Sequence, residues 1–521
     1  MKTLCDSLHL LHDDGNVVRV PMLVKGKIVA PPKIAREAIE AAFTSPDQTY
    51  ALVGDAQVLR EPIIDRKTMQ HTGEHQYQVL ARVDPLELIE RDERDLVSTL
   101  YALPFSEIVA YLNGLSEVLE RNADLVARVR EISRKTAPHP DLFHDAAFQA
   151  FPLILSAEVA GATVDAELAW NGIAGRRFLD GWVDVDANLF PGITAILGGQ
   201  IFGDVDLGEP RAELRAMPTR QLHITAGNAP AIPVFSLLRA IATKGAAVIK
   251  SPSGALVPGA VAAIAAASFA PDHPITKHLS LVYWRGGDRA VEDVLLSPMA
   301  FDRVVVWGAP DAVKSVQART ELTRTIAFNP RYGLSMIGKE AFASGSLREI
   351  AIRTSLDALV WNQKACIASF VQYVEGSLEQ AEAFGRVLSS VIGEWNDHAP
   401  NYVSPEAAGS LRRMRRGKYM NATWLPNVVV MDGKFDMLDH PMSRTMIVRR
   451  VDRLEDVLPT LHHGVASIGI YPEKRRLALR DLAMARGVSN VLPLGQVERT
   501  FGGMPHDGMR VLGDLVDWKH A

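Results

Sequence analysis

The chain contains two cysteines, Cys5 and Cys366, and the second lies where a thiol could act as a nucleophile. In the segment WNQKACIASF, Cys366 follows Asn362, Gln363 and Lys364 and precedes an apolar run that predicts a strand. Reactive groups are often placed at junctions between loops and regular elements, and a neighbouring lysine can favour the thiolate. The alternative is a small buried apolar residue, which is the usual role of a single cysteine.

A second group of polar residues lies earlier in the chain. Asn228 follows the predicted strand QLHIT in a turn, and Lys250 ends the next predicted strand, shortly before Ser253. The carboxyl ends of strands in a βαβ unit are where ligands bind. There an asparagine amide can donate a hydrogen bond, and a lysine can contact a phosphate or a ribose. Taken singly, the two residues could equally be a turn asparagine and a solvated lysine.

Motifs of several other classes of site are missing from the sequence. It contains no GxGxxG, GxxxxGK[ST], GxSxG, HExxH or CxxC pattern. The closest histidine pairs, His139 with His144 and His462 with His463, have no partners at metal-ligand spacing. The sequence therefore predicts no metal site.

The elements that would position these residues alternate between strands and helices. Residues 221–316 show this alternation, which predicts βαβ crossovers and a mostly parallel, Rossmann-like sheet. The pattern then restarts: residues 347–360 predict a helix, residues 361–365 a loop, and CIASFVQYVEG a strand. Cys366 is thus expected where a helix gives way to a strand. Before both regions, residues 104–135 predict an amphipathic helical segment that breaks near Asn122.

The length and composition are those of a soluble protein. A chain of 521 residues predicts two or more domains, and its net charge of −5 gives no general attraction to nucleic acid or anionic membranes. Two distant cysteines indicate a reducing compartment rather than a disulfide framework. The start lacks the pattern of a signal peptide, and the most apolar stretch, 254–270, predicts a buried core helix rather than a membrane span. We therefore expect a cytoplasmic protein.

Taken together, the segments AGNAP, IKSPS, VVVWGAP and NQKAC resemble, in order and separation, those of the aldehyde dehydrogenase superfamily. The segment FGGMPHDGM resembles the closing segment of that superfamily. The resemblance implies an α/β fold with two Rossmann-like domains and a β-strand arm that mediates homo-oligomerisation. It places the N-terminal region and the nicotinamide-binding domain in residues 1–332, with the arm strand near 201–220. The catalytic domain would occupy residues 333–490 and the closing segment residues 491–521.

Two departures make the chain more similar to the LuxC-type bacterial acyl-CoA reductases. Most aldehyde dehydrogenases carry a catalytic glutamate before Gly-Gly-Lys, where residues 327–333 of this chain are AFNPRYG. The closing segment contains Pro505-His506-Asp507-Gly508. In oxidising members the glutamate activates the water that hydrolyses the acyl-enzyme, so its absence favours reduction. LuxC-type enzymes make fatty aldehydes from activated fatty acids with NADPH.

The resemblance also implies roles for individual residues. Cys366 would attack the acyl thioester, and the Asn228 side chain with the Cys366 backbone N–H would stabilise the oxyanion. His506 would be a general acid late in the reaction, or else a loop histidine that holds a turn.

For the cofactor, the resemblance places Lys250 at the adenosine ribose or its 2′-phosphate, with Trp307 and Gly308 at the border of the site. Ser253 stands where NAD-preferring relatives often carry a glutamate, which favours NADPH and leaves NADH as an alternative. The usual Glu-Ile-Phe-Gly-Pro ribose anchor should fall near residues 440–448, where this chain instead begins HPMSRTM.

The sequence thus predicts NADPH-dependent reduction of a fatty acyl-CoA to an aldehyde through an acyl-cysteine. The alternatives are an NAD(P)-dependent aldehyde dehydrogenase that oxidises aldehydes and a catalytically inactive binding subunit of an acyl-transfer complex. The donor could be coenzyme A, a carrier protein or an acylated partner protein. The basic segment 411–418 is expected to be a solvated helix or turn, with a site for coenzyme A phosphates or for an acidic donor protein as the alternative.

Overall fold

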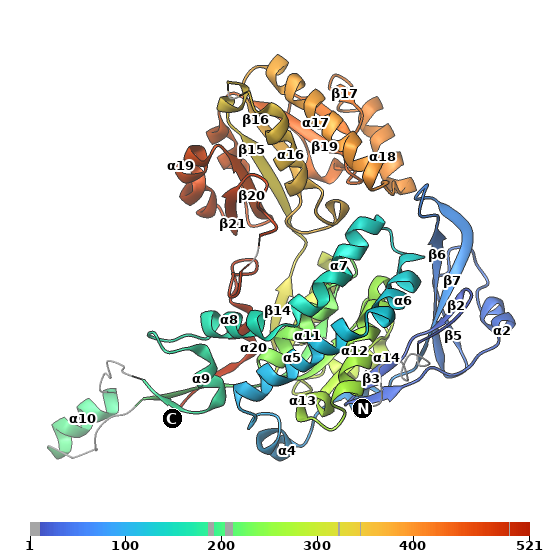
Figure 1. The fold of residues 1–521 in the computed structure, drawn as a ribbon. Coiled ribbons are helices and arrows are strands. Elements are labelled where there is room, and N and C mark those ends of the chain that lie inside the picture. The colour runs from blue at the N-terminus through green and yellow to red at the C-terminus, as the bar shows by residue number, and fades with distance from the viewer. Residues whose placement is uncertain (1–10, 186–191, 204–211, 321–322, 344, 500) are drawn as a thin grey trace.

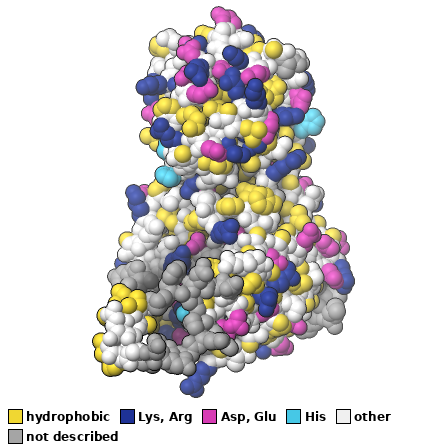
Figure 2. Space-filling model, turned by 90° about the vertical axis from the view of Figure 1, so that its left-hand side faces the viewer, with side chains coloured by type: hydrophobic (Ala, Val, Ile, Leu, Met, Phe, Trp, Pro, Cys, Tyr) yellow, Lys and Arg dark blue, Asp and Glu magenta, His cyan; other side chains and the backbone are white. Residues whose placement is uncertain are grey.

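The computed structural model of the protein describes residues 11–185, 192–203, 212–320, 323–343, 345–499 and 501–521. These residues form two lobes, one above the other in Figure 1, with a narrower waist between them (Figure 2). The lower lobe contains the chain up to Phe328 together with the C-terminal segment, and the upper lobe contains the strands from β15 to β21. The chain therefore crosses the waist twice.

The lower lobe is built on a seven-stranded sheet in the order β14-β13-β10-β11-β12-β3-β4. Its parallel strands are β10 (Arg220–Ile224), β11 (Ala246–Lys250), β12 (Leu279–Val282), β13 (Arg303–Trp307) and β14 (Arg324–Phe328). The helices between them are α11 (Ile232–Ala242), α12 (Leu256–Phe269), α13 (Pro274–Lys277), α14 (Arg289–Leu295) and α15 (Pro310–Gln317). The predicted parallel sheet is confirmed. Because β10 lies between β11 and β13, the strand order reverses there, at the switch point where doubly wound sheets bind ligands.

Helix α12 lies in the core of the lower lobe. Every residue from Leu256 to Ala266 is buried, because the helix is apolar on all sides. This confirms the core helix predicted for residues 254–270. Among the described residues, no single helix has both the length and the apolar composition of a membrane span. The bent pair α7 (Asp141–Ile154) and α8 (Ala157–Glu167), with 68° between the two helices, meets those criteria together.

The N-terminal region forms a separate five-stranded sheet and a layer of helices. The sheet has the order β1-β2-β7-β6-β5, with β1 (His12–Asp14), β2 (Val17–Arg19), β5 (Tyr50–Val53), β6 (Ala56–Ile64) and β7 (His71–Ala81). Strands β3 (Met22–Val24) and β4 (Lys27–Val29) extend the parallel sheet, and short helices α2 (Arg36–Ala41), α3 (Pro85–Leu88) and α4 (Glu93–Ser98) connect these parts. Helices α5 (Phe105–Arg121) and α6 (Ala123–Arg134) break at Asn122, as predicted.

The upper lobe is a second seven-stranded sheet, in the order β17-β18-β19-β16-β15-β20-β21. Its strands are β15 (Tyr332–Ile337), β16 (Ser369–Glu375), β17 (Thr423–Leu425), β18 (Val428–Met431), β19 (Met446–Val451), β20 (Val465–Tyr471) and β21 (Asn490–Pro493). Helices α16 (Leu347–Ala358), α17 (Leu378–His398), α18 (Pro405–Arg416) and α19 (Glu473–Met484) accompany them. All neighbouring strands are parallel except β17 and β18, which is the α/β pattern expected after residue 333.

A three-stranded antiparallel sheet projects from the lower lobe (Figure 1). It consists of β8 (Val183–Asp184), β9 (Glu213–Met217) and β22 (Asp517–His520), which follows α20 (Val511–Leu515). Strand β9 falls in the range expected for the arm strand, 201–220, and residues 204–211 of that range lie outside the described residues. Residues 201 and 202 end helix α10 (Ile193–Phe202), so the strand is shorter than expected.

Candidate active site

Asn228 and the loop that carries Cys366 meet between the two lobes. The Asn228 side chain, in the turn after β10, donates a hydrogen bond from Nδ2 to the carbonyl oxygen of Lys364 at 3.0 Å. Its Oδ1 is buried and has no hydrogen-bond partner among the described residues. The structure thus brings the predicted oxyanion donor within two residues of the predicted nucleophile. This contact spans the gap between the switch point of the lower sheet and the upper lobe.

The residues just before Cys366 have an uncommon backbone conformation. Trp361, Asn362 and Gln363 have φ angles of 50°, 57° and 65°, in the left-handed region that non-glycine residues rarely adopt. The Ala368 N–H then donates to the Ala365 carbonyl at 3.1 Å and closes a turn. Strand β16 therefore starts at Ser369. The prediction that the strand begins at Cys366 placed its start three residues too early.

The environment of Cys366 keeps its thiol protonated at rest. Burial, followed by the charge of Asp507, raises the pKa of Cys366 to about 11, although the Cys366 backbone N–H and Arg331 oppose this shift. Lys364 is not one of the groups that shift this pKa, so the prediction that Lys364 favours the thiolate is wrong. Burial lowers the pKa of Lys364 itself, and its carbonyl oxygen accepts the hydrogen bond from Asn228. The basic group that favours the thiolate is Arg331.

Asp507 and Arg331 are site residues that the sequence did not indicate. Arg331 Nε lies 3.5 Å from Asp507 Oδ2. Burial raises the pKa of Asp507, although Arg331 and Arg239 lower it. Asp507 and Gly508 both have positive φ angles, 52° and 80°, and the flanking residues His506 and Met509 pair through two hydrogen bonds of 2.9 Å. This is a type I′ turn, for which Asp-Gly is a preferred sequence. The dipeptide therefore indicated the turn, but the sequence did not indicate that the turn lies beside Cys366.

His506 lies in an aromatic cluster at the ends of β13 and β14. Its ring centroid is 5.1 Å from that of Trp307 and 4.7 Å from that of Phe328, and the latter two rings stack at 3.9 Å. Arg239 of α11 donates from Nη2 to His506 Nδ1 at 3.1 Å, and its guanidinium lies 5.6 Å from both aromatic centroids. The predicted cofactor-border residues Trp307 and Gly308 are therefore next to the predicted acid.

The electrostatics of this cluster restrict what His506 can do. Burial, Arg239 and Arg331 lower the pKa of His506 to about 3, so the ring is neutral at ordinary pH. Because Nδ1 accepts from Arg239, the ring proton is on Nε2. His506 can thus donate a hydrogen bond from a neutral imidazole, which is a different role from that of an imidazolium acid.

Lys250 ends β11 in a buried setting. It is 8% exposed, and its Nζ lies 5.4 Å from the ring centroids of both Tyr283 and Trp284. Among the described residues, Nζ has no hydrogen-bond or ion-pair partner; burial lowers its pKa to about 8, and the more distant charge of Glu292 opposes this shift. Ser253 lies three residues farther along, exposed at the start of a single 3-10 turn. A buried ammonium without an acidic partner, beside an exposed hydroxyl at a switch point, fits the ribose and 2′-phosphate of a nicotinamide dinucleotide.

His139 is a further residue near the site that sequence reasoning assigned no role. Burial and then Lys364 lower its pKa to about 3, and a hydrogen bond with the Asn228 backbone opposes this shift. Its ring lies 5.9 Å from that of Trp361. His144 Nε2 contacts Ser133 Oγ at 3.0 Å, and no group of three potential metal ligands occurs in the described part of the chain.

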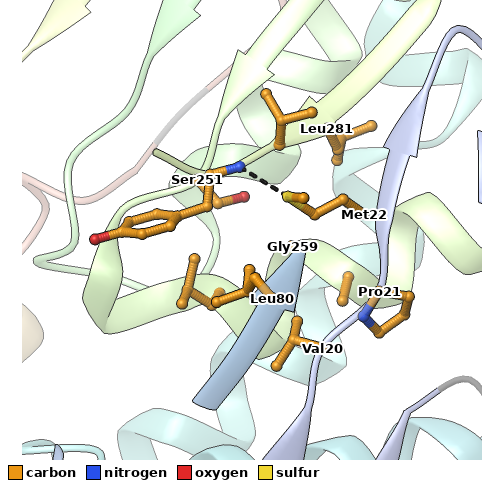
Figure 3. A pocket seen from close by; sticks show the side chains of 11 residues that line it. Val20, Pro21, Met22, Leu80, Ser251, Gly259 and Leu281 are labelled. Atoms are coloured by element: carbon orange, nitrogen blue, oxygen red, sulfur yellow. Dashed lines mark hydrogen bonds between the residues drawn. The ribbon is translucent and has the colours of Figure 1, made fainter. Parts of the chain in front are cut away.

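A small pocket lies beside the end of β11 that carries Lys250, where β3 meets β11, β12 and α12 (Figure 3). It is lined mainly by apolar side chains such as Val20, Leu80 and Leu281, and the Tyr283 N–H donates to Met22 Sδ at 3.2 Å beside it. Its volume of about 10 Å³ is roughly that of one water molecule. The pocket therefore lies in the packing between the N-terminal strands and the sheet. It is too small for a nicotinamide or an acyl chain.

The fold is that of the aldehyde dehydrogenases. Aldehyde dehydrogenase 21 from Physcomitrella patens, solved with succinate, matches 96% of this chain and 97% of its own length with a TM-score of 0.66 and 10% identity. The NADP-dependent glyceraldehyde-3-phosphate dehydrogenase from Bacillus halodurans C-125, solved with NADP, matches 96% and 98% with a TM-score of 0.65 and 14% identity. Identities this low establish the fold alone.

The sequence comparisons are more specific. The model of the family described as acyl-CoA reductase (LuxC) matches residues 205–518. A long-chain acyl-protein thioester reductase from Vibrio harveyi is 26% identical over 339 residues, which cover 63% of this chain and 69% of the relative. Another from Photobacterium phosphoreum is 22% identical over 489 residues, covering 89% and 92%. Since the family model covers more than half of the chain, the protein belongs to the LuxC acyl-CoA reductase family, as the sequence motifs predicted.

Proposed function

We propose that the protein reduces a fatty acyl thioester to the aldehyde through an acyl-Cys366 intermediate. The observation that carries the proposal is the contact between Asn228 and the Cys366 loop at the switch point of a nicotinamide-binding type of sheet. Membership of the LuxC family supports it, as do relatives named long-chain acyl-protein thioester reductases.

The first step is acyl transfer to the cysteine. The Cys366 thiolate attacks the thioester carbonyl, the bond to the donor sulfur breaks, and the donor leaves as a thiolate. Two donors remain for the oxyanion: the second hydrogen of Asn228 Nδ2, and the Cys366 backbone N–H, which makes no hydrogen bond to another described residue. Both donors would stabilise the negative charge that develops on the carbonyl oxygen only during the reaction.

The second step converts the acyl-cysteine to the aldehyde. Lys250 and Ser253, near the switch point, would hold the nicotinamide cofactor, which would supply the hydride. Asn228 and the Cys366 N–H hold the resulting oxyanion, and cleavage of the carbon–sulfur bond releases the aldehyde and restores the thiolate. His506, with a proton on Nε2, would act as a neutral hydrogen-bond donor at the border of this site.

The direction of the reaction is supported by the loop between the lobes. Residues 327–333, AFNPRYG, run from the end of β14 into β15 and contain no carboxylate where oxidising relatives carry their water-activating glutamate. Aldehyde oxidation remains the second candidate, because Asp507 is a carboxyl close enough to Cys366 to affect the pKa of its thiol. A carboxylate there could activate water in place of the missing glutamate.

NADPH is the proposed cofactor, with NADH as the alternative. The unpartnered Lys250 ammonium would attract a 2′-phosphate, and Ser253 can donate to it without repulsion. A glutamate at this position would instead favour the free ribose hydroxyls.

The acyl donor is proposed to be coenzyme A, with an acylated protein as the alternative that the names of the relatives suggest. Helix α18 carries four exposed arginines, Arg412, Arg413, Arg415 and Arg416, and none of them has an ion-pair partner among the described residues. Lys418 nearby is paired with Asp436 and Asp439. These arginines match either a nucleotide phosphate or an acidic protein surface.

A homo-oligomer is proposed from the β8-β9-β22 sheet, which projects from the lower lobe with open edges, as expected of an oligomerisation arm. Cytoplasmic localisation is proposed from the sparse use of cysteine.

The test is incubation with acyl-CoA of graded chain length, or an acylated carrier protein, and NADPH or NADH. We expect NADPH consumption that matches trapped aldehyde, and loss of both in Cys366→Ala, with Cys5→Ala as the control that keeps them. Full activity of Cys366→Ala would refute the covalent mechanism. Oxidation of added aldehyde without acyl reduction would favour the dehydrogenase. If Cys366 took no label from radioactive acyl donors, the protein would instead be a binding subunit.

A further inference from the structure

Residues 440–446, which replace the expected ribose anchor, form a second left-handed turn beside the turn that precedes Cys366. Met442, Ser443 and Arg444 have φ angles of 58°, 49° and 58°, like the three consecutive left-handed residues 361–363. Each such residue costs about 1–3 kcal/mol unless its surroundings hold it in place. Two adjacent runs of this kind therefore require strong mutual support.

Arg444 supplies that support through its guanidinium. Its Nε donates to Asn362 Oδ1 at 2.6 Å, and its Nη1 donates to Asn396 Oδ1 at 2.8 Å and to the Ala399 carbonyl. Arg444 thus ties the nucleophile loop to the end of helix α17, which packs against β18 and β19 in the sheet of the upper lobe.

Two amide side chains complete the connection between the turns. Gln363 Nε2 donates to the Thr445 carbonyl at 2.9 Å. Asn362 Nδ2 donates to Asn401 Oδ1 at 3.0 Å, and Asn401 Nδ2 donates to the Ser443 carbonyl at 2.9 Å. Both turns are therefore fixed by side chains that bond across from one to the other.

The charge of Arg444 indicates that this arrangement has more than a packing role. The side chain is fully buried, none of the described residues offers it a carboxylate within ion-pair distance, and Nη2 has no hydrogen-bond partner among them. Burial lowers its pKa to about 10, so it remains a cation at neutral pH. A buried charge held only by neutral oxygens is a costly way to stabilise a fold compared with apolar packing.

We propose that Arg444 is a positioning residue for the nucleophile: it holds residues 361–363 in the left-handed turn that aims the Lys364 carbonyl at Asn228 and sets the place of Cys366. In this chain the segment that would anchor the ribose supports the catalytic loop instead. Arg444 is not among the groups that shift the pKa of Cys366, so its effect is on geometry rather than on the charge of the thiol. The inference rests on the proposed role of Cys366 as the nucleophile.

The test compares Arg444→Lys, which keeps the charge but cannot form the fork of hydrogen bonds, with Arg444→Met. Arg450→Met is the control, because Arg450 lies in β19, the strand that follows Arg444, but pairs with Asp432 and Asp452. We expect single-turnover acylation of Cys366 to fall about 10- to 100-fold in both Arg444 variants, since small misplacements of reacting groups have effects of this size. The affinity for NADPH should stay within about twofold, and the apparent pKa of Cys366 alkylation within about 0.3 of a unit, which is roughly the error of such measurements.

A second measurement does not depend on the reaction. Amide hydrogen exchange at residues 362–368 should accelerate in the Arg444 variants and stay unchanged in β16. Asn401→Ala, which removes the bridge without burying a new charge, should show the same pattern more weakly if the Arg444 variants do not fold. The proposal is overturned if exchange accelerates without slower acylation, or if the variants weaken NADPH binding and leave acylation intact. Absence of acylation in the unmodified protein would instead refute the proposed function.

Discussion

The raised pKa of Cys366 leads to a quantitative prediction about its reactivity. With a pKa of about 11 instead of the ordinary value near 9, the thiolate fraction at pH 7.5 is about 3 in 10⁴ rather than about 3 in 100. Alkylation by iodoacetamide should therefore be about 100-fold slower than that of an unperturbed thiol, and its rate should still rise at pH 10.

Replacing Asp507 by Asn tests the part of this shift that arises from charge. Removing the carboxylate removes a charge that disfavours the thiolate, so the pKa of Cys366 should fall. Burial is the larger cause and remains, so we expect a fall of up to about one pKa unit and a two- to tenfold faster alkylation at pH 7.5.

The assay is the rate of iodoacetamide incorporation between pH 6.5 and 10 in a Cys5→Ser background, so that one thiol reports. Asp514→Asn is the control, because Asp514 lies in the same segment but pairs with Arg324. An unchanged profile in Asp507→Asn would show that this carboxyl does not act on the thiol. A wild-type titration near pH 8 to 9 would show that the thiol is not desolvated at rest.

Three further predictions concern other residues. Asn228→Ala should lower kcat by about 10²- to 10³-fold with little change in KM, measured in steady state; an equal loss through KM alone would contradict an oxyanion role. Ser253→Glu should raise the KM for NADPH at least about tenfold while NADH is still accepted, because the added carboxylate repels a 2′-phosphate; unchanged kinetics would place the phosphate elsewhere. Burial raises the pKa of Asp357 to about 7, although the Gly495 and Val497 N–H groups donate to it. Because the folded pKa lies above the unfolded one, stability should fall as pH rises from about 4 to 7, by about 1–4 kcal/mol, and Asp357→Asn should flatten the melting temperature across that range.

The parts of the site that follow from local patterns were predictable. Asn228 follows one parallel strand and Lys250 ends the next, and parallel strands connected by helices bring their carboxyl ends to one edge, so their placement followed from the alternation of elements. The break at Asn122 and the buried helix 256–266 also follow from local periodicity and composition.

The electrostatics of the site were not predictable, because they depend on contacts between distant segments. Burial is the largest cause of the pKa shifts of Cys366 and His506, and the charges that add to or oppose it, on Arg331, Asp507 and Arg239, come from three separate parts of the chain. Lys364, close in sequence, was the natural choice for a cation that acts on the thiol, yet Arg331 is the basic group that lowers the pKa of Cys366, and the Lys364 carbonyl bonds Asn228. Proximity in sequence is a poor guide where the backbone leaves regular geometry.

The return of the C-terminal segment to the lower lobe has a consequence for the order in which the protein can assemble during synthesis. Thr219 Oγ1 donates to the Leu515 carbonyl at 2.5 Å, and the Arg303 guanidinium donates to the carbonyls of Asp514 and Val516 at 2.8 and 3.0 Å. Strand β22 then pairs with β9. A ribosome completes the lobe with Cys366 once β21 has emerged, but the lobe with Asn228 must wait for these later residues. The half of the site that begins first is therefore finished last, and the two halves can align only after residues 514–520 have been synthesised.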